Sequence, residues 1–311
     1  MPLVLLPPPS ITPEHGFDAE VGGAHRPVAV DGRVPGAGDL LFAGMARATP
    51  TDALEDLQAV LLDLDGVLYV EGEPVEGAEE AVARLRAAGH ALRFVTNTTS
   101  RSRPATLEKL RRLGFELDET ELVTPAALAV RHCLQEGRTR VSLVMNDDVK
   151  SDFAELEQDH DRPEAVIVGD LGEGFDYEVL NRAFRHLTAG AELVALQKNR
   201  YWMREDGLSL DVGPFVAALE YAAGSEAYVV GKPAAGFFSE VLADVGVPSA
   251  AAAIVGDDVE TDVGGALDAG LAGILVRTGK YREHAVRASG IKPTATVESI
   301  ADVPDLLATA A

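Results

Sequence analysis

Four short segments of this 311-residue chain place acidic, hydroxyl, amide and cationic side chains directly after apolar stretches. They are Asp63-Leu-Asp65-Gly66, Thr96-Asn97-Thr-Thr99, Gly231-Lys232-Pro233 and Gly256-Asp257-Asp258, the last followed closely by Thr261-Asp262. Each apolar stretch has the length and composition of a buried strand. Because the carboxyl ends of parallel strands meet at one edge of a sheet, we expect these four segments to lie together.

Several carboxylates and one lysine gathered at one edge of a sheet predict that a cation and an anion bind there together, since like charges otherwise repel one another. Carboxylates without imidazole suit a hard cation such as Mg²⁺. A lysine with threonine and asparagine side chains suits a phosphoryl group. The turn that Gly66 allows can aim Asp63 and Asp65 at different atoms. One carboxylate can then attack phosphorus while the other transfers the proton of the leaving group.

The elements that must position these residues alternate between strand and helix. We expect strands at 59–63, 91–96, 141–145, 165–168, 191–196, 227–230, 252–255 and 273–276, and helices at 77–88, 103–113, 125–135 and 177–188. This alternation predicts an α/β fold, a doubly wound, Rossmann-like parallel sheet with helices on both faces. The stretch 140–211 repeats the strand–helix theme by itself, so we expect a smaller α/β domain inserted into the first.

The predicted organisation has four parts. Residues 1–55 are rich in Pro, Gly, Ala and acidic residues without a sustained period, and we expect a disordered extension there, with Met45 as an alternative start. Residues 56–139 form the first part of the core domain, 140–211 form the insert, and 212–311 form the second part of the core.

Composition excludes several classes of protein. The net charge of −23 opposes a role in coating DNA or RNA. The single cysteine, Cys133, excludes an internal disulfide and fits a reducing compartment. No apolar run approaches the ~18 residues of a membrane span, and Pro7-Pro8-Pro9 interrupts the apolar start. We therefore expect a cytoplasmic protein that binds no membrane.

In order and spacing, the segments DLDGVLY (63–69), TNTT (96–99), GKP (231–233) and GDDVETD (256–262) resemble the four motifs of the haloacid dehalogenase superfamily of phosphatases. The resemblance covers nearly all of residues 58–311. The position of the insert is similar to the type-two cap of the p-nitrophenylphosphatase and ribonucleotide-phosphatase branch.

A narrower resemblance rests on RFVTNTT, VVGKP, GILVRTGKYR and the stretch RYWMREDGLSLDVGPFVAALEYA. These look like the subgroup that contains phospholysine phosphohistidine inorganic pyrophosphate phosphatase. Animal members of that subgroup often carry Ser where this chain has Asp65. The resemblance therefore implies a catalytically complete enzyme, but not the narrow substrate of the animal enzymes.

The resemblance implies a role for each acidic residue of the motifs. Asp63 is the nucleophile and a Mg²⁺ ligand. Asp65 is the general acid and then the base, and its backbone carbonyl also binds the metal. Asp257 is the remaining carboxylate ligand of the metal. Asp258 and Asp262 lie behind these ligands and orient metal-bound water or the lysine.

The other matching residues handle the phosphate. The resemblance implies that Thr96 and Asn97 bind the transferring phosphoryl group, and that Lys232 neutralises its charge and restrains Asp63. We expect the polar loop 197–211 to line the cap side of the site, unless it is only a solvated loop; its basic and aromatic residues are Lys198, Arg200, Tyr201, Trp202 and Arg204. Caps of this type commonly form homodimers, which leaves dimerisation through the cap open.

These observations lead to a Mg²⁺-dependent phosphatase that hydrolyses small phosphomonoesters, with pyrophosphate and phosphoamino acids as further options, through an aspartyl-phosphate. A phosphotransferase would need the same residues and so stays open. A non-catalytic regulatory binding protein of the same fold would be expected to have lost Asp63, Asp65 or Asp257, and all three are present. The segment 273–280 is no phosphate-binding P-loop, because it is one residue too long and is followed by Tyr281.

Overall fold

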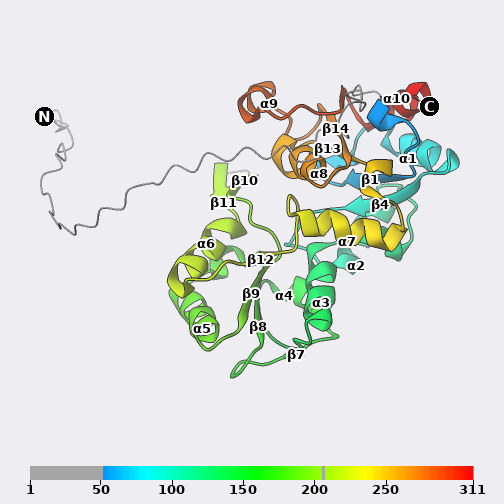
Figure 1. Ribbon diagram of the computed structural model, residues 1–311. Helices are drawn as coiled ribbons and strands as arrows, with labels where there is room; N and C mark the ends of the chain where they lie inside the picture. Colours follow the sequence, from blue (N-terminus) through cyan, green and yellow to red (C-terminus); the bar gives the residue numbers. More distant parts are fainter. Residues whose placement is uncertain (1–51, 205–206, 311) are drawn as a thin grey trace, which may run out of the picture. The chain divides into compact units, whose positions relative to one another are not determined.

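The computed structural model describes residues 52–204 and 207–310 (Figure 1). The predicted extension therefore lies outside the described residues as far as residue 51. Its last few residues differ from the prediction, because Asp52–Leu54 form a short 3₁₀ helix and Leu54 is buried in the core. None of the helices in the described ranges is long and apolar enough to cross a bilayer.

The larger sheet consists of six parallel strands (Figure 1). Their order is β15 (Ala295–Val297), β14 (Ala272–Val276), β13 (Ala252–Gly256), β1 (Ala59–Asp63), β4 (Ala91–Val95) and β5 (Leu122–Val123). From β1 the chain continues outward to β4 and β5 on one side of the sheet, and from β13 it continues outward to β14 and β15 on the other side. The strand order thus reverses between β1 and β13, which is where open parallel sheets bind ligands beyond their carboxyl ends.

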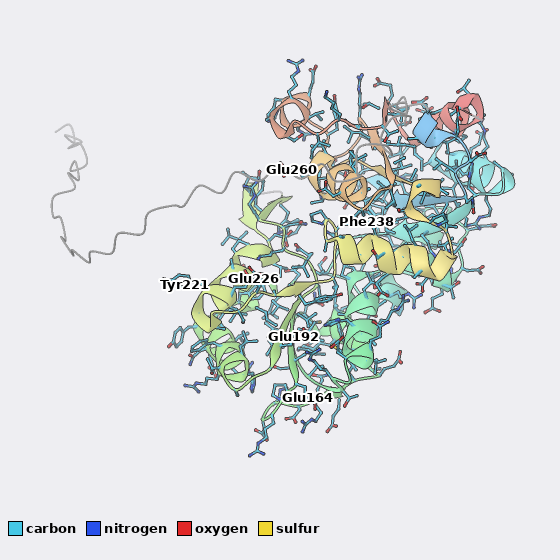
Figure 2. The ribbon with its side chains drawn as sticks, viewed as in Figure 1. Glu164, Glu192, Tyr221, Glu226, Phe238 and Glu260 are labelled. Atoms are coloured by element: carbon cyan, nitrogen blue, oxygen red, sulfur yellow. The ribbon has the colours of Figure 1, made fainter. Side chains whose placement is uncertain are left out.

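Helices cover both faces of this sheet. Alternate residues of β1 face opposite sides: Val60 and Leu62 pack in one apolar cluster, and Ala59 and Leu61 in the other, which also holds Phe238 (Figure 2). The first cluster includes α1 (Ala78–Ala87), α2 (Arg103–Arg112) and α10 (Val303–Ala310), and the second α3 (Pro125–Gln135) and α7 (Ala235–Val245). The predicted doubly wound α/β fold is confirmed. The predicted helices agree with the structure to within one residue at each end.

A second sheet contains five parallel strands. Their order is β12 (Tyr228–Val229), β9 (Glu192–Ala195), β8 (Ala165–Val168), β6 (Arg140–Val144) and β7 (Glu157–Gln158). The helices that accompany it are α4 (Asp147–Lys150), α5 (Tyr177–Thr188) and α6 (Val212–Ala223). This sheet confirms the second small α/β unit that the sequence predicted.

Two predictions about this second unit need correction. The strand expected at 227–230 as part of the core pairs instead with β9, Tyr228 opposite Val194, because a short apolar run does not reveal which sheet it will join. The stretch expected as a polar loop contains an antiparallel pair, β10 (Tyr201–Arg204) and β11 (Gly207–Leu210). The Asp206-Gly207 dipeptide between two partly apolar runs was the available hairpin signal.

Carboxylates of the second unit cap the first turn of core helix α2. Asp148 accepts hydrogen bonds from the backbone N–H of Ser102 (2.8 Å) and from its hydroxyl (3.1 Å). Asp152 accepts both of its hydrogen bonds from the backbone N–H of Arg103 (2.9 and 3.1 Å). Negative charge is stabilising at a helix N-terminus, where N–H groups lack intrahelical partners. Since α2 begins shortly after Thr96–Thr99, these bonds tie the second unit to the segment that carries two predicted site residues.

We predict that Asp148→Ala lowers the free energy of unfolding by about 1–2 kcal/mol, because it removes a cap and leaves buried Ser102 short of partners. Urea denaturation of the full chain measures the loss. The matched control is Asp147→Ala, whose side chain is 96% exposed beside Lys150 and which should lower the stability clearly less than Asp148→Ala does. Equal losses in the two variants would contradict the capping role.

Candidate active site

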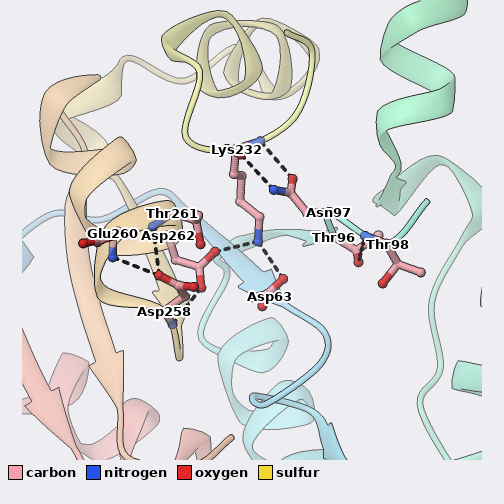
Figure 3. A network of polar contacts seen from close by, with 9 residues as sticks. All are labelled: Asp63, Thr96, Asn97, Thr98, Lys232, Asp258, Glu260, Thr261 and Asp262. Carbon is pink, nitrogen blue, oxygen red and sulfur yellow. Dashed lines mark hydrogen bonds and ion pairs between the residues drawn. The ribbon is translucent and has the colours of Figure 1, made fainter. Parts of the chain in front are cut away.

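The predicted site residues come from four places in the chain and meet at one edge of the core sheet (Figure 3). Asp63 is the last residue of β1, and Thr96 and Asp257 directly follow β4 and β13. The position of Lys232 differs from the prediction, because the strand before it, β12, belongs to the second sheet and not to the core sheet. It still reaches the edge, because its long side chain extends to the end of β1.

Lys232 is the cation at the centre of this cluster. Its Nζ lies 2.6 Å from Asp63 Oδ1 and 2.7 Å from Asp262 Oδ1, and the residue is only 2% exposed. Burial alone would lower the pKa of Lys232, but the charges of Asp262 and Asp63 and their hydrogen bonds raise it above its usual value. Lys232 thus holds both carboxylates through short ion pairs.

Asn97 fixes the backbone of Lys232. Its Nδ2 donates to the Lys232 carbonyl (2.8 Å), and its Oδ1 accepts from the Lys232 N–H (2.9 Å). Thr96 is buried, and its hydroxyl oxygen accepts a hydrogen bond from the Thr98 N–H (3.0 Å). Asn97 thus ties the turn after β4 to the turn that carries Lys232, while Thr96 closes the turn after β4 itself (Figure 3). Their part in phosphoryl binding stays a prediction.

Three buried carboxylates, Asp63, Asp257 and Asp262, each offer an oxygen within 4.8 Å of the other two. Asp262 uses both of its oxygens, one on Lys232 and the other on the Asp258 N–H (3.1 Å). Asp257 does not: Oδ2 accepts from the Lys280 N–H (2.6 Å), while buried Oδ1 has no hydrogen-bond partner among the described residues.

The charges of this cluster do not balance. Burial, followed by the charges of Asp63 and Asp262, raises the pKa of Asp257 to about 8. Burial also raises the pKa of Asp262, against the opposing effect of Lys232. Three carboxylates outnumber the buried ammonium group of Lys232, and the exposed Lys280 side chain adds one more positive charge that interacts with them. This excess of negative charge, with one carboxylate oxygen unpaired among the described residues, suits a further cation with a preference for oxygen ligands. The residues present therefore fit a divalent metal ion.

The carboxylates of Asp65 and Asp258 are not part of the group of three. Asp65 is exposed, so its side chain is free to meet a molecule approaching from solvent. Asp258 caps the π-helix Val259–Gly264, accepting through Oδ1 from the N–H groups of Glu260 and Thr261 (3.0 Å each; Figure 3). This local capping role explains why an acid follows Asp257.

Two further segments reach the site without having been predicted to do so. The loop after β14 contacts Asp257 through Lys280, as described above, although the sequence identified this stretch only as a failed P-loop and as part of a resemblance. The ammonium group of Lys109 lies 3.5 Å above the ring centre of Tyr69, four residues after Asp65. Burial lowers the pKa of Lys109, and the charge of Asp65 opposes this shift. Lys109 and Asp65 therefore interact electrostatically.

Comparisons with known proteins agree with this geometry. The model of a family described as haloacid dehalogenase-like hydrolase matches residues 60–158, and a related hydrolase-like model matches 229–303. The human "Haloacid dehalogenase-like hydrolase domain-containing protein 2" is 45% identical over 253 residues, covering 81% of this chain and 96% of that protein.

Two further relatives carry names that describe an activity. The bovine "Phospholysine phosphohistidine inorganic pyrophosphate phosphatase" is 41% identical over 262 residues, covering 82% of this chain and 96% of that protein. The solved structure of a p-nitrophenyl phosphatase from Archaeoglobus fulgidus superposes with a TM-score of 0.76 at 28% identity, covering 80% of this chain and 99% of the other.

Proposed function

The chain belongs to the haloacid dehalogenase-like hydrolases, in their p-nitrophenylphosphatase branch, and on that premise we propose that it is a Mg²⁺-dependent phosphatase of small phosphomonoesters that works through an aspartyl-phosphate on Asp63. The observation that carries this proposal is the buried group of Asp63, Asp257 and Asp262 around one lysine, at the point where the strand order reverses. Family membership identifies the enzyme class, and the charge imbalance supports the metal.

Asp63 is the nucleophile in this proposal. Its carboxylate attacks phosphorus, the bond from phosphorus to the leaving oxygen breaks, and a phosphoryl group remains on Asp63. Water then attacks the same phosphorus, releasing inorganic phosphate and restoring the carboxylate. Lys232, 2.6 Å from Asp63 Oδ1, holds the nucleophile in place and offsets the negative charge that gathers as two anions approach each other.

The metal would be held by Asp63, by Asp257 through its unpaired Oδ1, and by the backbone carbonyl of Asp65. When bound, Mg²⁺ neutralises phosphoryl oxygens and makes the attack of one anion on another feasible. Asp262 engages Lys232 and the Asp258 N–H, and so supports the site from behind. Asp65, exposed at the turn after β1, gives a proton to the leaving oxygen and then takes one from the attacking water.

We assign the second α/β unit as a cap, and we extend it to Val229 because β12 pairs within its sheet. The β10–β11 pair carries exposed Tyr201 and Trp202, and the basic residues Lys198 and Arg200 lie just before β10. An aromatic and basic hairpin suits a phosphorylated compound whose leaving part is flat or anionic. A homodimer formed through the cap stays a prediction.

The similarity to the bovine phosphatase suggests phosphoamino acids and pyrophosphate as substrates to try first. Phosphoryl transfer to an alcohol would use the same intermediate. Product analysis with and without added alcohol acceptors, alongside a panel of phosphorylated metabolites, separates hydrolysis from transfer and ranks the substrates.

The metal requirement gives the direct test. We expect EDTA to lower turnover of p-nitrophenyl phosphate by at least about 10³-fold, and added Mg²⁺ to restore it, since the metal contributes several kcal/mol to the transition state. Asp257→Asn should stay inactive with Mg²⁺ present while its circular dichroism spectrum remains that of the folded chain. The control is Asp147→Asn, which makes the same change at an exposed aspartate outside the proposed metal site. Full activity in EDTA would refute the proposed chemistry.

A further inference from the structure

The loop Thr278–Lys280, which follows β14, makes two hydrogen bonds to the segments that carry the metal-binding residues. The Lys280 N–H donates to Asp257 Oδ2 at 2.6 Å. The Thr278 hydroxyl donates to the carbonyl oxygen of Gly66, in the turn that follows Asp65. One short loop thus contacts both the end of β13 and the end of β1, the two strands between which the strand order reverses.

The contact is close enough to require glycine on both sides. Gly279 has a φ of +60° and Gly66 a φ of +91°, values that favour glycine. A Cβ on Gly279 would lie 2.1 Å from Asp257 Oδ2 and 2.4 Å from Gly66 Cα, and a Cβ on Gly66 would lie 1.9 Å from Asp257 Oδ2. The two backbones and the carboxylate therefore touch without any intervening side chain.

These contacts decide which oxygen of Asp257 remains available. Oδ2 is occupied by the Lys280 N–H, and both glycines lie close beside this same oxygen. Oδ1 is the buried oxygen, and it has no partner in the part of the chain that the structure describes. The Thr278 bond to the Gly66 carbonyl restrains the peptide next to Asp65, whose own carbonyl belongs to the predicted metal ligands.

We propose that the loop Thr278–Lys280 positions the metal site, with Thr278 as the positioning residue that restrains the Asp65–Gly66 turn and the Lys280 N–H as the group that presents Asp257 Oδ1 to the cation. The inference rests on the proposed function, because it concerns the same Mg²⁺ site. Mutating a hydrogen-bond partner that orients a metal ligand typically weakens metal binding by about 10–100-fold.

The test compares Mg²⁺ affinity, measured by isothermal titration calorimetry on the full chain, with the melting temperature of the metal-free chain. Thr278→Val removes the donor and keeps the side-chain shape, and should weaken Mg²⁺ binding by about 10-fold or more. Thr278→Ser retains a hydroxyl and should bind within about 3-fold of the wild type. Lys280→Ala keeps the backbone N–H and should bind Mg²⁺ no more weakly than the wild type.

A matched control lies at the opposite end of β14, where the Thr294 hydroxyl oxygen accepts from the Gly273 N–H (3.0 Å). Thr294→Val should lower the metal-free melting temperature without changing Mg²⁺ affinity. If Thr278→Val behaves in the same way, or binds Mg²⁺ like the wild type, the loop has only a structural role and the inference is overturned. A wild-type chain that binds no Mg²⁺ would overturn the proposed function and this inference together.

Discussion

Asp63→Asn is expected to form no phosphoenzyme and to lose turnover on the order of 10⁶-fold, the scale on which removing a covalent nucleophile slows a hydrolase. The amide retains the size of the side chain but has no carboxylate to attack phosphorus. Because the position is buried beside Lys232, the amide can still accept a hydrogen bond from Nζ, so the chain should stay folded.

Asp65→Asn is expected to do the opposite and accumulate the phosphoenzyme. This variant keeps Asp63, Lys232 and its own backbone carbonyl, but loses the proton donor and base. A leaving group such as p-nitrophenolate scarcely needs a proton, so phosphoryl transfer to Asp63 persists. Hydrolysis of the intermediate still needs a base to activate water, and general acid–base catalysis typically contributes ~10²–10⁴-fold. Dephosphorylation should slow by that factor.

Intact-protein mass spectrometry in acid after mixing with substrate distinguishes the two variants. An added mass of about 80 Da should appear on Asp65→Asn and be missing from Asp63→Asn. Asp147→Asn should behave like the wild type, because its side chain is 96% exposed and pairs with Lys150. An adduct on Asp63→Asn, or wild-type turnover by Asp65→Asn, would mean that the two carboxylates have been assigned the wrong way round.

Lys232→Met is expected to cost about 3–5 kcal/mol of unfolding free energy in the metal-free chain, the usual loss when one partner of a buried ion pair is removed. Methionine fills a similar volume, so the cost is electrostatic. The substitution leaves carboxylate oxygens of Asp63, Asp257 and Asp262 buried within 4.8 Å of one another, without the Lys232 ammonium group between them. The same change should also abolish turnover, because it removes the hydrogen bond that Lys232 donates to Asp63.

Urea denaturation in EDTA measures this loss. Lys198→Met is the matched control, since Lys198 also pairs with an acid, Glu220, at 2.7 Å, but is 41% exposed. Its pair should contribute at most about 1 kcal/mol. Added Mg²⁺ should recover part of the stability of Lys232→Met, because a dication can replace the missing positive charge. Equal losses in the two lysine variants would show that burial of the pair has no energetic importance.

Local signals in the sequence were sufficient to place most elements. Helices α2 and α3 begin after Ser102 and Thr124, whose hydroxyl oxygens accept from N–H groups three residues on, and each has proline in its first turn. These are short-range interactions, so the residues that make them are visible in a window of a few positions. Strands β1, β13 and β14 of the core sheet are buried on both faces, which gives the uninterrupted apolar runs from which they were predicted.

The same local view did not reveal which sheet a strand would join. Val229 pairs with Ala195 of the second sheet, although its apolar run resembles those of the core. Which strand pairs with which depends on residues far apart in the chain, and these cannot be identified from a run of two to five residues. The β10–β11 pair was missed for a different reason, because the charged residues within it disguised the alternation of a strand.

By itself, the sequence determined which side chains could do chemistry and, through the ends of strands, that Asp63, Thr96 and Asp257 would share one edge. Only the tertiary structure decided how the charges there are distributed. It paired Asp262 with Lys232, one of the two roles that the resemblance had implied, and used Asp258 as a helix cap. It also brought Gly279 against Gly66, with Asp257 Oδ1 left without a partner among the described residues. Those outcomes depend on distances of a few ångströms between segments up to about 200 residues apart, and the energy of a buried charge depends on every such neighbour.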